Sequence, residues 1–352
     1  MTLLTDRFPR PPYDIEIEPL VKAAADNTES FVGDFDLKKL REEALRREHP
    51  RTQALLADKT VTCQDVVIPG PRNDLTLTVV RPAGEPSEPR PCIFYIHGGA
   101  MVRSDRYAGL DSSILWAREL GAITISVEYG LAPENAGTEP AEDCYAALLW
   151  AGKNADALGI DADRLILYGV SAGGGLAASV ALMIRDRKGG HPVALRGLFL
   201  TAPMLDDRAA SVSAQQFVTG PMYNSTINRA AWRCLLGERA GSTADVVSAY
   251  EAPARAQDLS GLPPTYLDCG TAEPFRDDDA AFATKLWEGG VQAEFHAWPG
   301  APHAFDRIAP DAAISKLAKA TRLAWLRRIL ETEARGQSGQ VTNGTVSQQT
   351  IE

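Results

Sequence analysis

The chain has 352 residues, of which 45% are hydrophobic and 23% charged, a composition typical of a globular protein with one large α/β domain or two smaller ones. Its net charge of −10 argues against nucleic acid or an anionic membrane as a partner. The five cysteines are scattered without metal-binding spacing, and no apolar leader or membrane span is visible, so we expect a reduced, cytoplasmic protein.

Residues 1–60 form the first section of the chain. They begin with several prolines and continue with apolar residues at helical spacing over 21–25 and 37–45. Charge runs such as 46–48 are interpreted as solvated helix faces. We expect this section to be an appendage of helices packed on the main domain.

Strands and helices alternate over residues 61–335, the predicted main domain. An antiparallel hairpin is predicted for 61–68 and 75–80. The other predicted strands are 92–96, 122–127, 164–168, 195–200, 265–269 and 291–298, and the predicted helices are 112–120, 139–158, 172–188, 277–288 and 312–333. This alternation predicts the α/β class, with a mostly parallel central sheet and helices on both faces.

Two segments depart from that rhythm. Residues 205–255 mix loop-like stretches with a helical patch at 227–236, which indicates an insertion. Residues 336–352 are rich in Gly, Ser, Gln and Thr, a composition that predicts a disordered tail.

The pentapeptide Gly169-Val170-Ser171-Ala172-Gly173 lies between an apolar strand and a helix of small residues. Strand, sharp turn and helix are the context in which G-x-S-x-G forms a nucleophile elbow. Its glycines allow close approach of the backbone, and the following helix directs N–H groups at the reacting atom. Ser171 is therefore the candidate nucleophile, although a glycine-rich turn with an incidental serine would show the same short pattern.

A serine hydroxyl needs a base, which is usually a histidine that a carboxylate orients. His303 lies in a loop just past a predicted strand, whereas His296 lies inside that strand and is interpreted as an ordinary strand residue. For the acid, Glu273 follows the strand 265–269 on a loop, and Asp277 falls in the first turn of a helix, where acids usually serve the helix dipole. We therefore predict His303 as the base and Glu273 as the acid, with Asp277 as the alternative.

The segment His97-Gly98-Gly99 follows a buried strand that ends at the same edge of the predicted sheet. Glycines there let backbone N–H groups turn toward a developing oxyanion. We predict an oxyanion hole from the N–H groups of Gly98, Gly99 and Ala172.

Taken together, these motifs resemble those of the hormone-sensitive-lipase-like (family IV) esterases of the α/β-hydrolase superfamily. The match runs from about residue 91 to residue 305. In order, the motifs are His97–Ala100 against H-G-G-G, Tyr129–Glu134 against Y-R-L-A-P-E, Gly169–Gly174 against G-x-S-A-G-G, Pro203–Arg208 against P-x-L-D-D-R, Glu273–Asp277 against D-P-L-R-D, and His303–Phe305 against H-G-F.

The resemblance implies an α/β-hydrolase fold and a catalytic triad of Ser171, Glu273 and His303. It also implies a cap formed by the N-terminal helices and the 205–255 insertion, no metal or organic cofactor, and a homodimer. Three residues depart from the family pattern. Glu273 replaces the usual Asp, Ala100 replaces the third glycine, and Gly130 replaces an arginine that would supply a structural ion pair.

The function predicted from the sequence is that of a serine carboxylesterase acting on small or medium acyl esters. A lactonase, a deacetylase or an amide or carbamate hydrolase would use the same groups, and the scaffold does not decide among them. A binder without catalysis is a different class, which the presence of all three triad residues disfavours. A true lipase is also disfavoured, because no large amphipathic lid is visible.

Overall fold

The computed structural model describes residues 8–26, 36–84, 88–187 and 193–331. Within these ranges eight strands form one sheet in the order β1-β2-β4-β3-β5-β6-β7-β8. The strands are β1 (Val61–Ile68), β2 (Leu75–Pro82), β3 (Arg90–Ile96), β4 (Ile123–Val127), β5 (Ile160–Val170), β6 (Leu195–Thr201), β7 (Thr265–Gly270) and β8 (Ala293–Trp298). The pairs β1–β2 and β2–β4 are antiparallel and all others are parallel, which confirms the predicted hairpin and the mostly parallel sheet.

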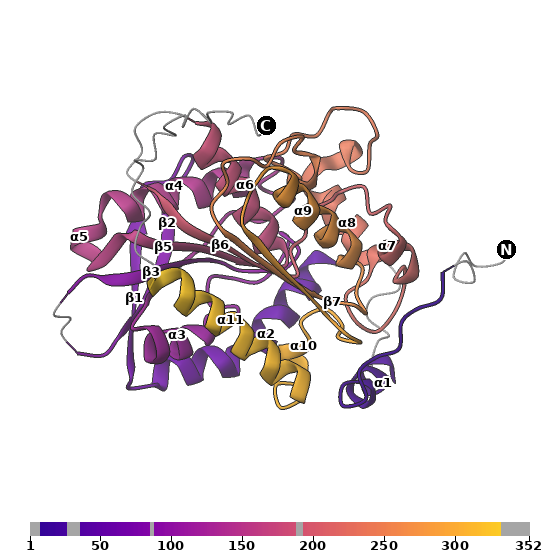
Figure 1. Cartoon of the computed structure of the whole chain (residues 1–352), viewed down its shortest axis with the longest axis horizontal. Helices are drawn as coiled ribbons and strands as arrows, with labels where there is room; N and C mark the ends of the chain where they lie inside the picture. Colours follow the sequence, from indigo (N-terminus) through magenta and orange to yellow (C-terminus); the bar gives the residue numbers. More distant parts are fainter. Residues whose placement is uncertain (1–7, 27–35, 85–87, 188–192, 332–352) are drawn as a thin grey trace, which may run out of the picture.

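Helices cover both faces of this sheet (Figure 1). The α-helices are α1 (Glu18–Asp26), α2 (Leu37–Ala57), α3 (Ser112–Leu120), α4 (Glu139–Lys153), α5 (Ala155–Leu158), α6 (Ala172–Asp186), α7 (Val212–Gln216), α8 (Ser225–Leu236), α9 (Arg276–Glu288), α10 (Phe305–Ile308) and α11 (Ala313–Glu331). Figure 1 shows α4, α6 and α9 on one side of the sheet and α3 and α11 on the other. None of the helices in the described ranges has the length and apolar content that a membrane crossing needs.

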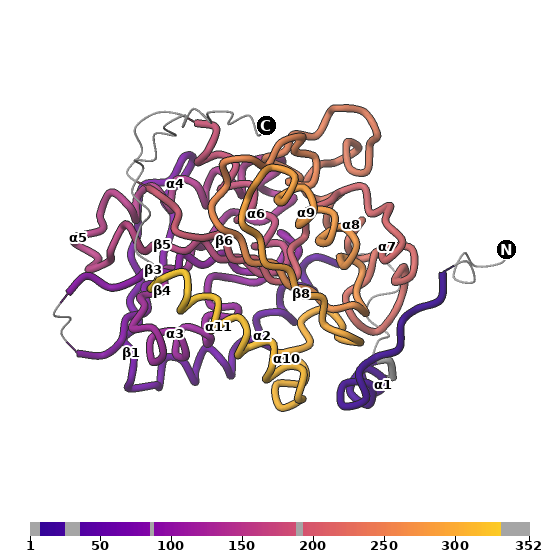
Figure 2. The backbone as a smooth tube through the Cα atoms, viewed as in Figure 1, coloured from indigo at the N-terminus to yellow at the C-terminus, as the bar shows by residue number. Residues whose placement is uncertain are grey.

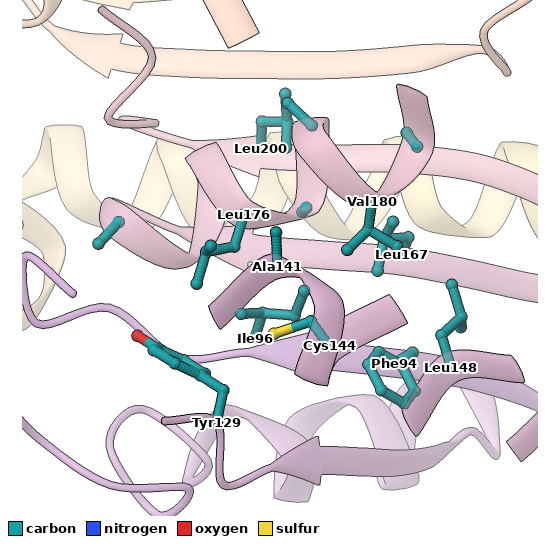
Figure 3. Close-up of a cluster of buried hydrophobic side chains, with 14 of the residues drawn as sticks. Phe94, Ile96, Tyr129, Ala141, Cys144, Leu148, Leu167, Leu176, Val180 and Leu200 are labelled. Atoms are coloured by element: carbon teal, nitrogen blue, oxygen red, sulfur yellow. The ribbon is translucent and has the colours of Figure 1, made fainter. Parts of the chain in front are cut away.

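The central strands are apolar on both faces, and successive side chains enter different cores. Phe94 and Leu167 face the larger core, which Leu148 of α4 and Val180 of α6 complete (Figure 3). Their sequence neighbours face the opposite core, where tyrosines and tryptophans from β3, β5, α3 and α11 meet. This two-sided burial fixes the strand register, and with it the place where each strand ends and the site residues begin.

Several element boundaries differ from the prediction. The helix predicted for 139–158 is two helices, because the Asn154 side chain donates to the carbonyl oxygen of Trp150 at 2.8 Å and ends α4. β5 begins at Ile160 rather than at residue 164, since Ile160 already pairs with Arg90 of β3. The short helix α10 was not predicted, and the predicted tail, 336–352, lies outside the described residues.

Helix α2 packs beside α10, although some 250 residues separate them in the sequence (Figure 2). The interpretation of residues 46–48 as a solvated face is wrong for Glu48. Its carboxylate accepts two hydrogen bonds from Arg307, at 2.6 and 2.8 Å, and its side chain is only 18% exposed. Arg46 is exposed as predicted. The ion pair therefore joins the N-terminal section to the segment that follows β8.

Candidate active site

Ser171 lies at the sharp turn between β5 and α6, with φ 55° and ψ −121°. Such a backbone conformation costs a non-glycine residue on the order of 1–3 kcal/mol, and here surrounding contacts hold it. The Ser171 N–H donates to Thr201 at 2.9 Å, and its carbonyl accepts from Met204 at 2.9 Å. A Cβ on Gly169 would lie 2.0 Å from a backbone oxygen, and one on Gly173 2.1 Å, so only glycine fits at either position.

A continuous hydrogen-bond chain joins the three predicted triad residues. His303 Nε2 lies 3.0 Å from Ser171 Oγ, and His303 Nδ1 lies 2.5 Å from Glu273 Oε2. The other carboxylate oxygen of Glu273 accepts the N–H of Gly270 at 2.7 Å. The side chain of Glu273 is 1% exposed, so solvent hardly screens it from the imidazole. Because a carboxylate can only accept, Nδ1 carries the proton, and Nε2 is free to take one from the serine.

The neighbouring aromatic rings fix the plane of the His303 imidazole. Phe275 meets it edge-on with ring centroids 5.3 Å apart, and Tyr223 packs on it at 5.0 Å. Phe275 lies between β7 and α9, and Tyr223 comes from the 205–255 segment. Tyr223 was not singled out in the sequence, since nothing in its local pattern distinguishes it from a core aromatic.

The structure brings Glu273, and not Asp277, to His303. Asp277 instead accepts hydrogen bonds from the N–H of Ser213 at 2.6 Å and from Arg276 at 2.7 Å. Burial alone would raise the pKa of Asp277, but these donors outweigh burial and lower it. Asp277 therefore connects α9 to α7. His296 lies in β8, as predicted, and contacts Glu294.

The N–H groups of Gly98, Gly99 and Ala172 have no hydrogen-bond acceptor among the described residues. A Cβ on Gly98 would lie 2.9 Å from the Val170 carbonyl oxygen and 3.3 Å from Ser171 Cβ, so this backbone passes directly beside the serine. Gly99 has φ 123°, which favours glycine. Three unpaired donors beside Ser171 can bind a developing oxyanion.

His97 holds the backbone of the loop after β3 in place. Its Nδ1 donates to the Gly98 carbonyl at 2.7 Å, and burial lowers its pKa to about 4. The Tyr129 ring stacks on the imidazole at 4.3 Å, and its hydroxyl donates to the His97 carbonyl at 2.9 Å. Tyr129 belongs to the 129–134 motif, so this motif contacts and supports the loop that begins at His97.

Of the departures from the family pattern, the structure explains Gly130 locally and does not explain Ala100. A Cβ on Gly130 would lie 2.4 Å from the Asn135 side chain, which occupies the space of a larger residue. The Gly130 N–H donates to Asp143 at 3.0 Å, and Arg72 pairs with the same carboxylate at 2.6 Å. An ion pair is therefore present beside Gly130, supplied by Arg72. Ala100 has φ 57°, so its backbone takes a conformation that glycine would adopt at less cost.

A buried charged network lies behind the site and was missed in the sequence. Arg322 of α11 donates to both oxygens of Asp268 at 2.7 and 3.1 Å, and to Asp306 at 2.5 Å. Asp268 is in β7 and Asp306 follows His303 by three residues, so the network fixes the histidine loop against the sheet. The three residues of this network line a cavity of about 210 Å³ together with Glu273 and His303. The only sequence signal was an acidic residue at a strand position.

The main cavity has a volume of about 490 Å³ and reaches Ser171, His303 and the oxyanion glycines. Its walls come from five parts of the chain, namely α2, β3 with the loop that follows it, residues 170–171, residues 221–227 and residues 303–308. Cavities of this size accommodate small organic ligands. The Ser171 hydroxyl, the His303 imidazole and the backbone of Gly98 and Gly99 therefore lie at one cavity.

Comparison with known proteins agrees with the fold described above. A family model described as "alpha/beta hydrolase fold" matches residues 93–307. Carboxylesterase NlhH of Mycobacterium tuberculosis is 32% identical over 244 residues, 68% of this chain and 74% of that protein. Esterase LipI of the same organism is 31% identical over 235 residues, covering 66% and 71%. The solved structure titled "Bacterial Heroin Esterase" superposes with a TM-score of 0.78 at 34% identity, covering 89% of this chain and 99% of that one.

Proposed function

Since the chain belongs to the α/β-hydrolase family, we propose that it hydrolyses carboxylic esters through an acyl-enzyme on Ser171, with His303 as the base and Glu273 as the acid. The hydrogen-bond chain from Glu273 through His303 to Ser171 carries this proposal. The three similar proteins described above are named as esterases, which favours ester hydrolysis over the lactone, amide and carbamate alternatives.

In the first half of the reaction, Ser171 Oγ attacks the acyl carbonyl carbon while His303 Nε2 takes the hydroxyl proton. The carbonyl oxygen becomes an oxyanion facing the N–H groups of Gly98, Gly99 and Ala172. When the intermediate collapses, the bond to the alcohol oxygen breaks and the imidazolium gives its proton to the leaving alcohol. Water then repeats the sequence with His303 as base, releasing the carboxylic acid and restoring Ser171.

The acid and the oxyanion donors lower the barrier in different ways. The Glu273 carboxylate orients the imidazole and stabilises its positive charge in the transition state. Each oxyanion donor is worth about 100- to 1000-fold in rate, because it is already in place when the charge develops. The strained backbone of Ser171 keeps Oγ at the mouth of the hole throughout.

We assign the cap to the N-terminal helices and the 205–255 segment. Ala44 of α2 and Met222 and Ile227 of the 205–255 segment line the cavity above Ser171, which supports this assignment. With a cavity of about 490 Å³, we expect small and medium acyl groups to fit better than long fatty chains.

A cytoplasmic location and a homodimer complete the proposal. All five cysteines are free, which supports a reducing compartment. The homodimer rests on the family resemblance, and light scattering of the purified protein measures it directly.

The test is the initial rate of hydrolysis of nitrophenyl acetate, butyrate and palmitate by the wild-type protein and by Ser171→Ala. We expect activity on the two short esters that the substitution abolishes. Activity that persists in a folded Ser171→Ala variant would overturn the proposal. A folded wild-type protein without activity on any of the esters would favour the binder.

A further inference from the structure

The cavity above Ser171 is cationic although the whole chain carries a net charge of −10. Four arginines and two glutamates are the charged residues that line it within the described ranges, namely Glu43, Arg47, Glu48, Arg51, Arg103 and Arg307. Two positive charges are thus left over at neutral pH. A surplus of this sign in a cavity attracts anionic ligands.

Three of the four arginines have carboxylate partners. Arg307 donates to Glu48 at 2.6 and 2.8 Å, Arg51 lies 3.8 Å from the same carboxylate, and Arg47 forms an ion pair with Glu43. Within the described residues, the Arg103 side chain has no hydrogen bond and no ion pair. As far as the described part of the chain shows, Arg103 is therefore the guanidinium of this cavity that a ligand can bind without displacing an existing ion pair.

Arg103 is held beside the oxyanion hole by its own backbone. Its N–H donates to the Gly99 carbonyl at 3.1 Å, and its side chain lines the cavity with Tyr223, the ring that packs on His303. Burial lowers the pKa of Arg103 and Arg47 lowers it further, while Tyr223 and the more distant Glu43 carboxylate act in the opposite direction. Partial burial of a guanidinium with no carboxylate in direct contact costs free energy, which a carboxylate on a ligand would offset.

We propose that Arg103 binds a carboxylate on the substrate, so that the preferred substrates are monoesters of small dicarboxylic acids or acyl esters of small hydroxy acids. This inference rests on the proposed ester hydrolysis at Ser171. The fork of a guanidinium matches a carboxylate in a bidentate manner. A phosphate would bring a second negative charge toward Glu43 and Glu48, which favours the singly charged group.

The test compares esters that differ only in this charge. Monoethyl succinate and ethyl levulinate have nearly the same shape, and the carboxylate of the first is a methyl ketone in the second. The pair 4-acetoxybutanoate and 5-acetoxypentan-2-one places the charge on the alcohol side instead. The readout is the ratio of kcat/KM for the anionic ester to that for the neutral ester, measured by pH-stat titration.

We expect the wild-type protein to prefer the anionic ester in at least one of the two pairs. A preference in the first pair would place Arg103 at the acyl part of the substrate, and a preference in the second pair would place it at the alcohol part. Arg103→Met should lower that ratio by about 10- to 100-fold, the effect of a charge-assisted hydrogen bond. Arg103→Lys should lower it less, because lysine keeps the charge but loses the fork. Arg103→Gln provides the same comparison if Arg103→Met is unstable.

Arg47→Met is the matched control, since it removes one positive charge from the same cavity but takes it from an existing ion pair. We expect it to lower the ratio by less than about 3-fold, because an exposed pair contributes little. A ratio that does not depend on Arg103, or that falls equally in Arg47→Met, would overturn the inference. Turnover of ethyl levulinate that Ser171→Ala abolishes would still uphold the proposed function in either case.

Discussion

Replacing Glu273 by Gln tests which carboxylate serves His303, the proposed catalytic base. Glu273 accepts two hydrogen bonds, from His303 Nδ1 at 2.5 Å and from the Gly270 N–H at 2.7 Å. An amide has one acceptor oxygen and one donor nitrogen. If the oxygen faces Gly270, the NH2 group faces His303 and forces the proton onto Nε2, which then cannot accept the serine proton.

We expect this variant to lose about 10³- to 10⁴-fold in kcat, which corresponds to roughly 4–5.5 kcal/mol of transition-state stabilisation. The opposite amide orientation does not rescue it, because the NH2 group would then meet the Gly270 donor. Steady-state kinetics on nitrophenyl butyrate measure the loss, and circular dichroism confirms that the variant is folded.

Asp277→Asn is the matched control for this experiment. Asp277 connects α9 to α7 and does not contact His303, so the substitution should lower the thermal midpoint and leave kcat within a few-fold of the wild-type value. A reversed ranking, with Asp277→Asn the more damaging to kcat, would refute the reasoning and move the acid to Asp277.

Three other substitutions probe the proposed oxyanion hole, a half-buried acid and the proposed cap. Gly98→Ala should lower kcat by about 100-fold or more, because the new Cβ would lie 2.9 Å from the Val170 carbonyl oxygen and displace an oxyanion donor; unchanged kinetics would remove Gly98 from the hole. Burial and the neighbouring carboxylates raise the pKa of Asp278 to about 7, above the value of about 4 expected in the unfolded chain. The folded chain thus binds more protons between these values, so the stabilisation is present below pH 4 and is lost as pH rises to 7. Asp278→Asn should therefore raise the thermal midpoint at pH 8 more than at pH 4, whereas the same change at the exposed Asp163 should not, and equal shifts would contradict the argument. Met222→Ala should shift the preference from acetyl toward longer acyl esters by several-fold, since it enlarges the cavity; an unchanged profile would argue against the cap assignment.

Local sequence signals were sufficient to predict the candidate site residues that lie in turns at the ends of strands. The pentapeptide around Ser171 required a strand and a helix on either side, and both are present. His303 was preferred to His296 as the candidate base because His303 follows a predicted strand, whereas His296 lies within it. The choice of Glu273 over Asp277 used the same reasoning, and the structure places Glu273 against His303. In each case a boundary between elements determined the position of the side chain.

Contacts between distant segments could not be read in this way. Glu48 meets Arg307 across 259 residues, so its charge run resembled an ordinary solvated helix face. Asp268 and Arg322 are 54 residues apart, and neither lies in a recognisable motif. Arg103 follows the His97–Ala100 motif by three residues. That its guanidinium makes no hydrogen bond or ion pair within the described residues depends on the positions of side chains from distant segments. Pairing of this kind depends on the tertiary fold.

The measurement that tests the central claim most directly is labelling with a serine-reactive alkyl phosphonate, followed by peptide mass spectrometry. The account predicts one label per chain, on the peptide that contains Ser171, with loss of ester hydrolysis in proportion to labelling. His303→Ala should slow the labelling strongly, because the base is gone. A label on another residue, or full ester hydrolysis by protein already labelled at Ser171, would contradict the account.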